Sequence, residues 1–394
     1  MKRLISIIAV CAACAANAQT DSLLSRSMND FSLSAYRQVA AVKSGANFIF
    51  SPLSVNMAMR MAEAGAQGKT LEEMAAVVSR YESQLAANEN IARLMSSFAD
   101  EGDYKLKLVN AAWLQQKYNL RSDYVDIVRN KFGADVRNVD FVKNKNRKKA
   151  VLAINKWVSQ STNGMIKQLV SDESLSCTTR LVLTNAIYFK CNWQSQFRSS
   201  NNVTLKFKQI DGKAVETTYM KQTEHYKYFE CTDYQVISLP YSTDRFQMVF
   251  MMPAAQCFDS IESSINVDFL KDAMSKMEEE QVSVTIPKFK METDVDFTSL
   301  LQQMGVVEAF GNNADFTAMT KKNDLKITQV LHKAVIEVEE KGTEAAAATA
   351  VIMGLKSAHM PQLKRFFADH PFIYFIWDSE NELMLFAGRY VKVP

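Results

Sequence analysis

The chain is poor in the residues that separate domains. Its 394 residues include only 7 prolines and 12 glycines, and no stretch rich in proline, glycine and serine interrupts the interior. Since domain boundaries usually fall in such linkers, their absence argues against the two or three domains that the length alone suggests. A composition of 47% hydrophobic and 23% charged residues also excludes general disorder. We therefore expect one large folded domain.

Long hydrophobic runs are missing from the chain after residue 18. No later stretch approaches the roughly 20 apolar residues that a membrane span requires, so we expect no span. Residues Met1–Ala18 differ, because a charged start at Lys2 and Arg3 precedes a short apolar run and a small-residue cleavage site. This pattern predicts a signal peptide and a secreted or periplasmic mature domain over residues 19–394. Cys14 leaves lipid attachment open, although the residues before it fit such a site poorly.

Neither sign of charge dominates the chain. There are 46 basic and 43 acidic residues, and removal of the signal peptide with its two basic residues leaves 44 against 43. The net charge therefore predicts no nucleic-acid partner. Four cysteines remain after cleavage, and their spacing fits no zinc site. We expect no metal, and we interpret these cysteines as buried free thiols: Cys177, Cys191, Cys231 and Cys257.

Catalytic and nucleotide-binding motifs are also missing. The four histidines, His225, His332, His359 and His370, are accompanied by no G-x-S-x-G or H-E-x-x-H motif, so we expect no enzyme. Gly65–Thr70 imitates a phosphate loop, but two residues separate its glycines where four are required, and a helix precedes it. We expect a helix-ending turn there and no cofactor.

The order of the predicted elements indicates an α+β fold. Helical spacing covers residues 22–42, 55–64 and 149–160, with shorter helices between 70 and 95. Early strands are expected at 47–51 and 105–114. After residue 181 strands dominate, at 181–189, 203–207, 226–240, 246–252, 282–290, 325–339, 372–377 and 383–391. Helices that gather early and strands that gather late are typical of α+β folds, not of alternating βαβ units.

The most informative segment reads E-E-K-G-T-E-A-A-A-A-T and spans Glu339–Thr349. Residues 335–339 before it alternate apolar and acidic side chains, the pattern of a half-buried strand. The four alanines have too little apolar surface to hold themselves in a core, so we interpret the segment as a hinge. If it became a strand, one face would carry no charge and could enter a core, whereas Glu344 would point to the other face. That uncharged face would be formed by Thr343, Ala345, Ala347, Thr349, Val351 and Met353.

Together with the segments around it, this hinge resembles that of the serpins, the suicide inhibitors of proteases. The similarity runs from about Ser22 to the C-terminus. It rests on Asn47–Thr70, Asn155–Val158, Thr162–Gly164, Leu183–Lys190 with Trp193, Pro287–Phe289, Gly305, Asp315-Phe316, His332–Val335 and the closing Leu385–Val391. The resemblance implies the serpin fold: one large α+β domain with about three β-sheets, helices packed around them, and an exposed reactive-centre loop over about 341–361.

The resemblance also implies roles for single residues. A polar cluster beneath the main sheet, where its central strands part, is called the shutter: Ser51, Ser54, Asn185 and His332. The top of this opening, the breach, is implied to hold Trp193 and an ion pair of Lys288 with Glu340. The implied hinge comprises Glu340, Gly342, Thr343, Glu344, Ala345, Ala346, Ala347, Ala348 and Thr349.

For the activity, the resemblance implies an inhibitory serpin of a bacterial type. Such a protein is cut in its loop and then traps the target protease as a covalent acyl-enzyme. Counting from Gly342 by the usual spacing places the cut bond at Lys356-Ser357, with Met353-Gly354 and Leu355-Lys356 as alternatives. A lysine before the bond suits a trypsin-like serine protease. Two alternatives stay open: a non-inhibitory serpin that acts as a binding module, and an inhibitor of cysteine proteases with basic specificity. The expected form is a monomer.

A basic cluster over Lys143–Lys149 coincides with the start of a predicted helix. Cations at this end of a helix oppose its macrodipole, which is mildly unfavourable. The cluster is interpreted as a solvated surface, with binding of a polyanion as the alternative.

Overall fold

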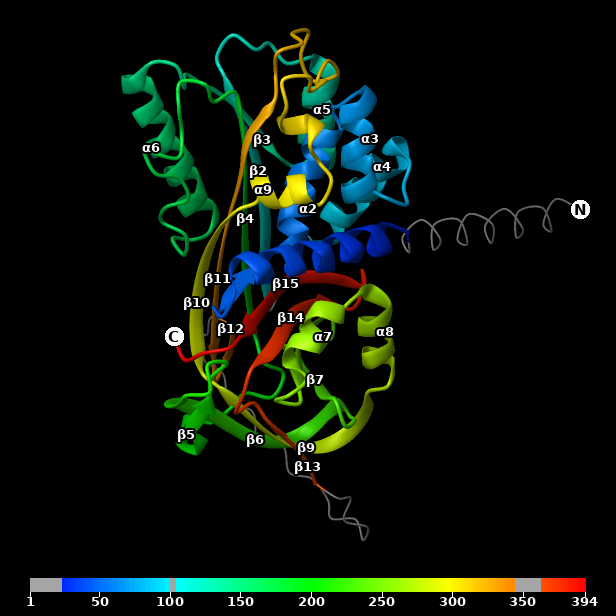
Figure 1. Ribbon diagram of the computed structural model, residues 1–394, viewed down its shortest axis with the longest axis vertical. Coiled ribbons are helices and arrows are strands. Elements are labelled where there is room, and N and C mark those ends of the chain that lie inside the picture. The colour runs from blue at the N-terminus through cyan, green and yellow to red at the C-terminus, as the bar shows by residue number, and fades with distance from the viewer. Residues whose placement is uncertain (1–22, 99–103, 344–362) are drawn as a thin grey trace, which may run out of the picture.

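The protein is described by a computed structural model over residues 23–98, 104–343 and 363–394. Its strands form two large sheets, with helices gathered mainly around one of them (Figure 1). The predicted signal peptide with Cys14, the hinge residues Glu344–Thr349 and the predicted bond Lys356-Ser357 lie outside the described residues. The α+β class predicted from the sequence is confirmed.

The six-stranded sheet contains the site discussed below. Its order is β10-β11-β12-β4-β2-β3, and β11 also pairs directly with β4 over part of its length. The strands span Phe289–Asp296 (β10), Ile327–Glu339 (β11), Gly342–Thr343 (β12), Leu181–Asn192 (β4), Tyr104–Gln115 (β2) and Asp135–Val139 (β3).

The nine-stranded sheet forms the lower half of the molecule in Figure 1. Its order is β1-β15-β14-β8-β7-β6-β9-β13, with β5 paired to β6. The strands span Phe48–Phe50 (β1), Leu383–Tyr390 (β15), Phe372–Asp378 (β14), Phe246–Pro253 (β8), Tyr234–Pro240 (β7), Ala214–Glu230 (β6), Glu278–Pro287 (β9), Lys364–Phe367 (β13) and Val203–Lys208 (β5). About three sheets were expected. The 17-residue β6 pairs with β5 and β9 and, at its far end, with β7, so hydrogen bonding joins two of the expected sheets into one.

Helices cover both faces of the six-stranded sheet. A helix over residues 23–42, with α2 to α5, lies on one side, whereas α6 lies alone on the other (Figure 1). The helices span Pro52–Glu63 (α2), Gly68–Val78 (α3), Gln84–Ser97 (α4), Ser122–Phe132 (α5), Asn144–Ser161 (α6), Phe258–Ser264 (α7), Val267–Ser275 (α8) and Thr298–Gln303 (α9). None of the helices in these described ranges is long and apolar enough to cross a membrane.

Helix α2 is buried along its whole length, as its apolar residues on most sides predicted. The Ser51 hydroxyl caps it by accepting a hydrogen bond from the N–H of Ser54, and Pro52 occupies the first turn, where its missing N–H costs nothing. The helix thereby fixes Ser51 and Ser54 beneath the six-stranded sheet.

Two predicted elements differ from the structure. The strand expected over 226–240 is interrupted at Cys231–Asp233, where β6 turns into β7 as a hairpin. The apolar residues on both sides of this hairpin hid it from the sequence pattern. Helix α6 begins at Asn144 and thus includes most of the basic cluster that was placed at its start.

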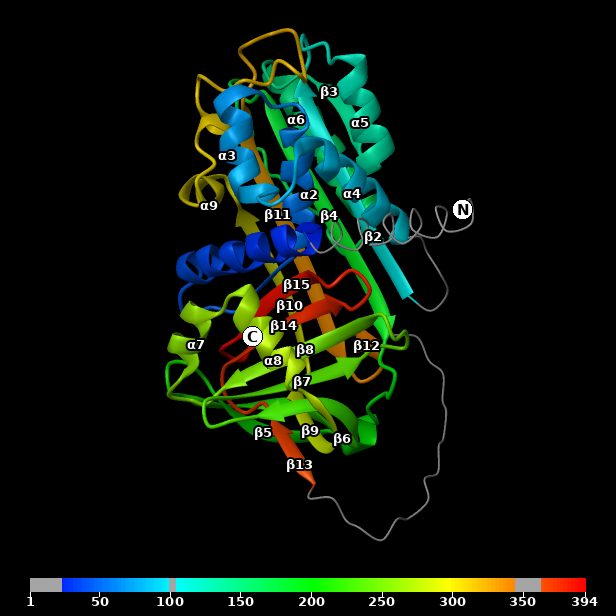
Figure 2. The same cartoon turned by 90° about the vertical axis from the view of Figure 1, so that its right-hand side faces the viewer.

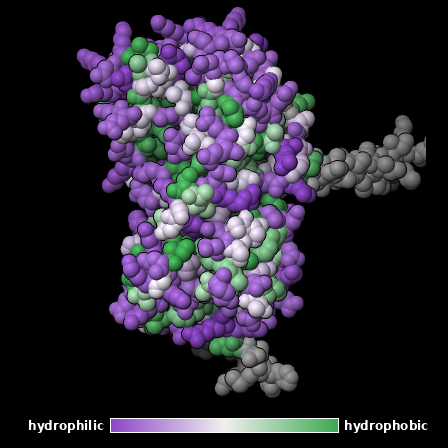
Figure 3. Space-filling view, in the orientation of Figure 1, coloured by the Kyte–Doolittle hydropathy of each residue, from purple (hydrophilic) through white to green (hydrophobic). Residues whose placement is uncertain are grey.

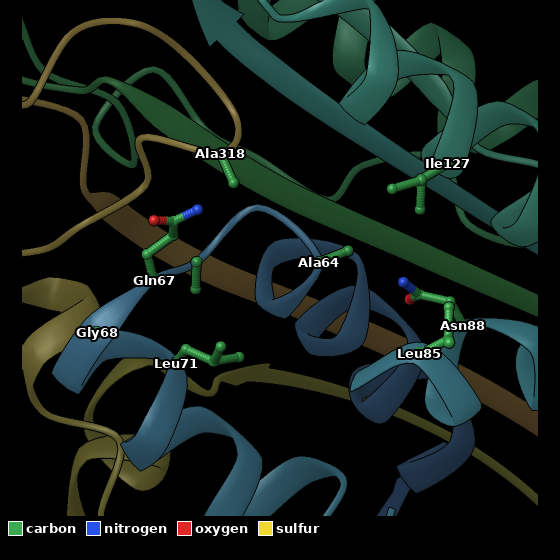
Figure 4. A pocket seen from close by; sticks show the side chains of 9 residues that line it. Ala64, Gln67, Gly68, Leu71, Leu85, Asn88, Ile127 and Ala318 are labelled. Atoms are coloured by element: carbon green, nitrogen blue, oxygen red, sulfur yellow. The ribbon is translucent and has the colours of Figure 1, made fainter. Parts of the chain in front are cut away.

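The segment that imitates a phosphate loop joins α2 to α3. Gly65 does not cap α2, because Ala64 holds the C-cap position; instead, a Cβ on Gly65 would meet Met319 and Tyr124 at 2.8–2.9 Å. A hollow of about 430 Å³ lies beside the segment, lined mostly by alkyl groups such as Leu71 and Leu85 (Figure 4). With no lysine or arginine among its lining residues, this hollow offers no charge to a phosphate.

The four cysteines among the described residues are free thiols in the structure. Cys191 is buried, as expected, but Cys177 and Cys231 are exposed and Cys257 is half-buried. Burial was therefore wrongly predicted for three of them, which lie in or next to turns and not in strand interiors. No group of three or more potential metal ligands occurs among the described residues.

Candidate functional site: the fork between β4 and β11

The central strands of the six-stranded sheet form a fork. At one end β11 pairs directly with β4 in parallel, from Ile327 opposite Leu181 to His332 opposite Asn185. At the other end β12 lies between them and is antiparallel to both. Between these two zones, residues 333–337 of β11 and 186–190 of β4 are not paired with each other or with another described strand on this side. The sheet therefore has a stretch in its centre that no described strand fills. Figure 2 shows β4 crossing the molecule from the upper helices to the end where β12 lies.

Gly342 allows β12 to enter the fork. It pairs with Asn192 on β4 and with Glu339 on β11. Its φ of +144° is a conformation that other residues rarely adopt, and a Cβ here would collide with the backbone of Cys191 and Asn192. Only glycine fits this close approach, which explains why a glycine occupies this position of the hinge.

Thr343 follows Gly342 and is already part of the sheet. It pairs with Val338 and Cys191, only 4% of its surface is exposed, and its hydroxyl hydrogen-bonds that of Tyr241 (2.8 Å). The sequence interpretation treated Thr343 as an exposed residue that enters the core only after the loop is cut. That expectation is wrong, because the open end of the fork takes in two residues of the intact chain.

Trp193 clamps the turn that leads into β12. Its indole Nε1–H donates to the carbonyl oxygen of Glu339 (2.8 Å), and its backbone N–H donates to that of Lys341 (2.9 Å). The indole also stacks on Tyr241, with ring centroids 4.6 Å apart. From the same loop, the N–H of Phe197 donates to the carbonyl oxygen of Glu340 (2.8 Å). The turn is thus held by three hydrogen bonds from Trp193 and Phe197.

The side chain of Glu340 is fixed by two partners. Lys288 Nζ lies 3.0 Å from its Oε2, and Asn202 Nδ2 donates to its Oε1 (2.6 Å). Burial by itself would raise the pKa of Glu340, but the hydrogen bond from Asn202 and the ion pair with Lys288 outweigh it and lower the pKa. Lys288 also contacts Glu339 (3.3 Å). The structure thus brings together the pair that the resemblance implied.

The polar residues of the implied shutter meet at the base of the fork. His332 Nε2 accepts a hydrogen bond from the N–H of Ser51 (3.0 Å), and the Ser51 hydroxyl donates to the carbonyl oxygen of Leu385 (2.6 Å). In the next strand, Asn185 Nδ2 donates to Asn110 Oδ1. His332, Asn185 and Asn110 are register partners across β11, β4 and β2, so they form one polar rung across the sheet.

This rung is incompletely satisfied. Three of its buried atoms have no hydrogen-bond partner among the described residues: Asn110 Nδ2, Asn185 Oδ1 and His332 Nδ1. The same holds for Ser54 Oγ on α2. Buried polar groups normally have partners, and these atoms lie where the two central strands part. Burial lowers the pKa of His332 to about 3, so the imidazole is neutral at pH 7. Because Nε2 accepts, Nδ1 carries the proton.

Sequence reasoning missed four residues of this site: Asn110, Phe197, Asn202 and Tyr241. Asn110 was detectable in principle, since it is an amide within the predicted strand 105–114, but nothing indicated that it faces Asn185. Tyr241, Phe197 and Asn202 lie in loops or at strand ends, where no periodicity gives a direction. Their roles depend on the contacts with Trp193 and Glu340 described above.

Comparison with known proteins agrees with this architecture. The family model described as "Serpin (serine protease inhibitor)" matches residues 26–393. An uncharacterized serpin-like protein of Thermococcus kodakarensis is 38% identical, over 92% of this chain and 84% of that protein. Neuroserpin of Mus musculus is 33% identical, over 92% and 90%.

Solved structures agree as well. The crystal structure of Serpin48, described as a highly specific serpin in the insect Tenebrio molitor, has a TM-score of 0.85 and 29% identity. The match covers 95% of this chain and 99% of that one. The chain therefore belongs to the serpin family, whose members are mostly serine protease inhibitors and not enzymes.

Proposed function

We propose that this serpin is a suicide inhibitor that inserts its cut loop into the fork and so traps the protease as a covalent acyl-enzyme. The observation that carries the proposal is the unfilled stretch between β4 and β11, with β12 already seated at its open end. A strand that continues from β12 would gain backbone partners on both sides. The hinge is the segment of the chain that continues from β12.

The register fixes how far the hinge can enter before the sheet must open. Because β12 is antiparallel to both neighbours, each further residue moves one position back along β11 and β4. Six more residues, 344–349, would bring Thr349 level with His332 and Asn185, the last directly paired residues of the two strands. Insertion beyond Thr349 would have to separate direct β4–β11 pairs, so the polar rung marks the point where resistance begins.

The alanines match the side chains they would meet. In this register, residue 345 lies between Ile336 and Phe189, and residue 347 lies between Ala334 and Ile187, all four of them buried. These positions share the core-facing side of Thr343. Small side chains fit a filled core where large ones would overpack it. Glu344 would lie on the other face, opposite Lys190.

Insertion of the rest of the loop supplies the driving force. At about 1 kcal/mol per new backbone hydrogen bond, a strand of the length available would release on the order of 10 kcal/mol. Loop insertion in serpins is an established example of strand addition and of the release of stored strain. The proposed cut is at Lys356-Ser357, with a trypsin-like serine protease as the target, because a lysine suits its acidic specificity pocket.

A denaturing gel after mixing with trypsin tests the proposal. The expected result is a complex that resists denaturation and contains both chains, together with a fragment released from the C-terminal side of the loop. Cleavage without a complex would support a non-inhibitory serpin, and the same complex with a cysteine protease of basic specificity would support the other alternative. Lys356→Leu should shift inhibition to chymotrypsin- or elastase-like enzymes. Unchanged inhibition of trypsin by this variant would remove Lys356 from the role.

We also propose that the protein is exported, as a bacterial type of serpin, through the predicted signal peptide. The support is the sequence pattern of residues 1–18. N-terminal sequencing of protein recovered outside the cytoplasm should start at Gln19. A start at Cys14 with an attached lipid would show membrane anchoring instead.

A further inference from the structure

The segment between β13 and β14 fastens the C-terminal base of the loop. Strand β13 has only four residues, is the first strand after the loop, and pairs with β9 alone among the described strands. Residues 368–371 then lead into β14. The N–H of Ala368 donates to the carbonyl oxygen of Thr285 (3.0 Å), and the N–H of Lys208 donates to that of Asp369 (2.7 Å). Such a short edge strand depends on the contacts of this segment to stay in place.

His370 adds a contact from this segment to β8. Its Nδ1 lies 2.7 Å from Asp369 Oδ1, and its Nε2 lies 2.8 Å from the carbonyl oxygen of Pro253, the last residue of β8. Both partners are hydrogen-bond acceptors. A neutral imidazole has one N–H and could bond only one of them, whereas an imidazolium donates to both. The geometry therefore fits the charged form of His370.

The imidazole of His370 lines an open hollow of about 440 Å³ at the surface. Its side chain is 17% exposed, so it can exchange a proton with water. Figure 3 shows hydrophilic as well as hydrophobic residues at the lower end of the molecule, where β13 lies in Figure 1. Glu230 of β6 and, from β13, Lys364 and Arg365 line the same hollow. Glu230 and Lys364 form an ion pair (2.8 Å), which largely balances their charges near the ring.

The direct neighbours of His370 favour the charged ring. Burial by itself lowers the pKa of His370, but the hydrogen bonds to the Asp369 carboxylate and to the Pro253 carbonyl outweigh it and raise the pKa above 6.5. The positive charge of Lys208, on β5, acts in the opposite direction and lowers the pKa. The charged groups around the ring are therefore Asp369 and Lys208 nearby, with those of the hollow.

We propose that His370 is a pH-dependent fastener that ties the base of the loop to β8. In the charged form it holds residues 368–371, and with them β13, against the end of β8. Loss of the proton leaves one ring nitrogen facing an acceptor without a hydrogen, so one of the two contacts must be given up. Because folding raises the pKa, the stabilisation is fully present below pH 6.5 and is lost as the pH rises through the raised pKa.

The two ends of the loop are then held by different means. At its start, β12 is held in the fork by backbone pairing, which does not titrate. At its end, β13 is held by four residue pairs and by a segment whose attachment titrates. The loop should therefore be anchored at both ends at mildly acidic to neutral pH and become loose at its C-terminal base at alkaline pH. This inference does not depend on the proposed mechanism of inhibition.

The first test is NMR of protein labelled with ¹⁵N in its histidine rings. The chain has four histidines, and the signals of His370 are those that are missing from the variant His370→Gln. Both ring nitrogens of His370 should carry a proton at pH 6, and the ring should lose one with a midpoint above 6.5. His332 is an internal reference, because its ring should stay neutral over this range. A midpoint of His370 at or below 6.5 would overturn the proposal.

The second test is hydrogen exchange of residues 364–371, corrected at each pH for the intrinsic exchange rate. Protection should fall by up to about tenfold per pH unit across the titration of His370 and should lose this dependence in His370→Gln. Strand β3, an edge strand of the six-stranded sheet, is the internal control and should show no such change. The same dependence in His370→Gln, or none in the unchanged protein, would overturn the proposal.

A milder variant keeps the test decisive if His370→Gln does not fold. Since Lys208 opposes the proton on His370, Lys208→Gln should move the midpoint of both measurements to higher pH, most clearly at low ionic strength. Lys206→Gln is the matched control, because it removes the same charge from the same strand at a residue that does not act on His370. Its midpoint should equal that of the unchanged protein. No shift in Lys208→Gln, or equal shifts in both variants, would overturn the assignment to His370.

Discussion

Replacing Ala345 by arginine should turn the inhibitor into a substrate. In the register set by β12, position 345 would come to lie between Ile336 and Phe189, which are 2% and 6% exposed. An arginine without a partner in such a place costs several kcal/mol. Before the loop is cut, the substitution falls outside the paired residues of β12, so the intact protein should keep its stability.

The size of the effect follows from a competition between two rates. Trapping requires insertion to finish before the acyl-enzyme is hydrolysed, and each ~1.4 kcal/mol added to the insertion barrier slows it about tenfold. A cost of about 3 kcal/mol therefore slows insertion about 100-fold. The loop should still be cut, but the protease should escape.

The assay is the stoichiometry of inhibition, obtained by titrating a fixed amount of trypsin. Glu344→Arg is the matched control, because its side chain would face the opposite side of the sheet, next to Lys190 and Glu337. The control should change the stoichiometry little, whereas Ala345→Arg should raise it many-fold. A stable complex formed by Ala345→Arg at normal stoichiometry would refute the register and the insertion mechanism with it. Thr343→Arg is less informative, because Thr343 is already buried in the intact protein.

Further outcomes are expected at the fork. Gly342→Ala should lower the thermal midpoint of the intact protein. The φ of +144° and the collision of the new Cβ with the backbone of Cys191 should cost about 1–3 kcal/mol of stability. An unchanged midpoint would contradict the close approach of the two backbones. Cleavage of the loop by a non-target protease should raise the thermal midpoint, and an equal or lower midpoint would indicate a loop that does not insert. Because the pKa of His332 falls from 6.5 to about 3 on folding, the unfolded chain binds the extra proton. Stability should therefore fall as the pH drops from 6.5 towards 3, by up to ~1.4 kcal/mol per pH unit, and His332→Gln should flatten this dependence in denaturant titrations.

The sequence by itself determined the class of the fold and the burial of α2. Helical spacing before residue 181 and strand patterns after it follow from local periodicity, which depends on which side of each element is buried. The fully apolar pattern of α2 predicted a buried helix, and the run of alanines predicted a segment with little commitment to one structure. Periodicity and local composition depend on residues that are neighbours in the chain, so both can be predicted from the sequence.

Only the tertiary structure decided how the hinge meets the sheet. Thr343 is buried because β4 and β11 diverge enough to admit two residues, and that divergence depends on strands separated by more than 130 positions in the chain. Three further contacts also join residues that are far apart in the chain. They are the hydrogen bonds of Asn185 with Asn110, of Asn202 with Glu340 and of Tyr241 with Thr343. Pairing register and side-chain contacts between distant segments are set by packing of the whole domain, and no local pattern in the sequence encodes them.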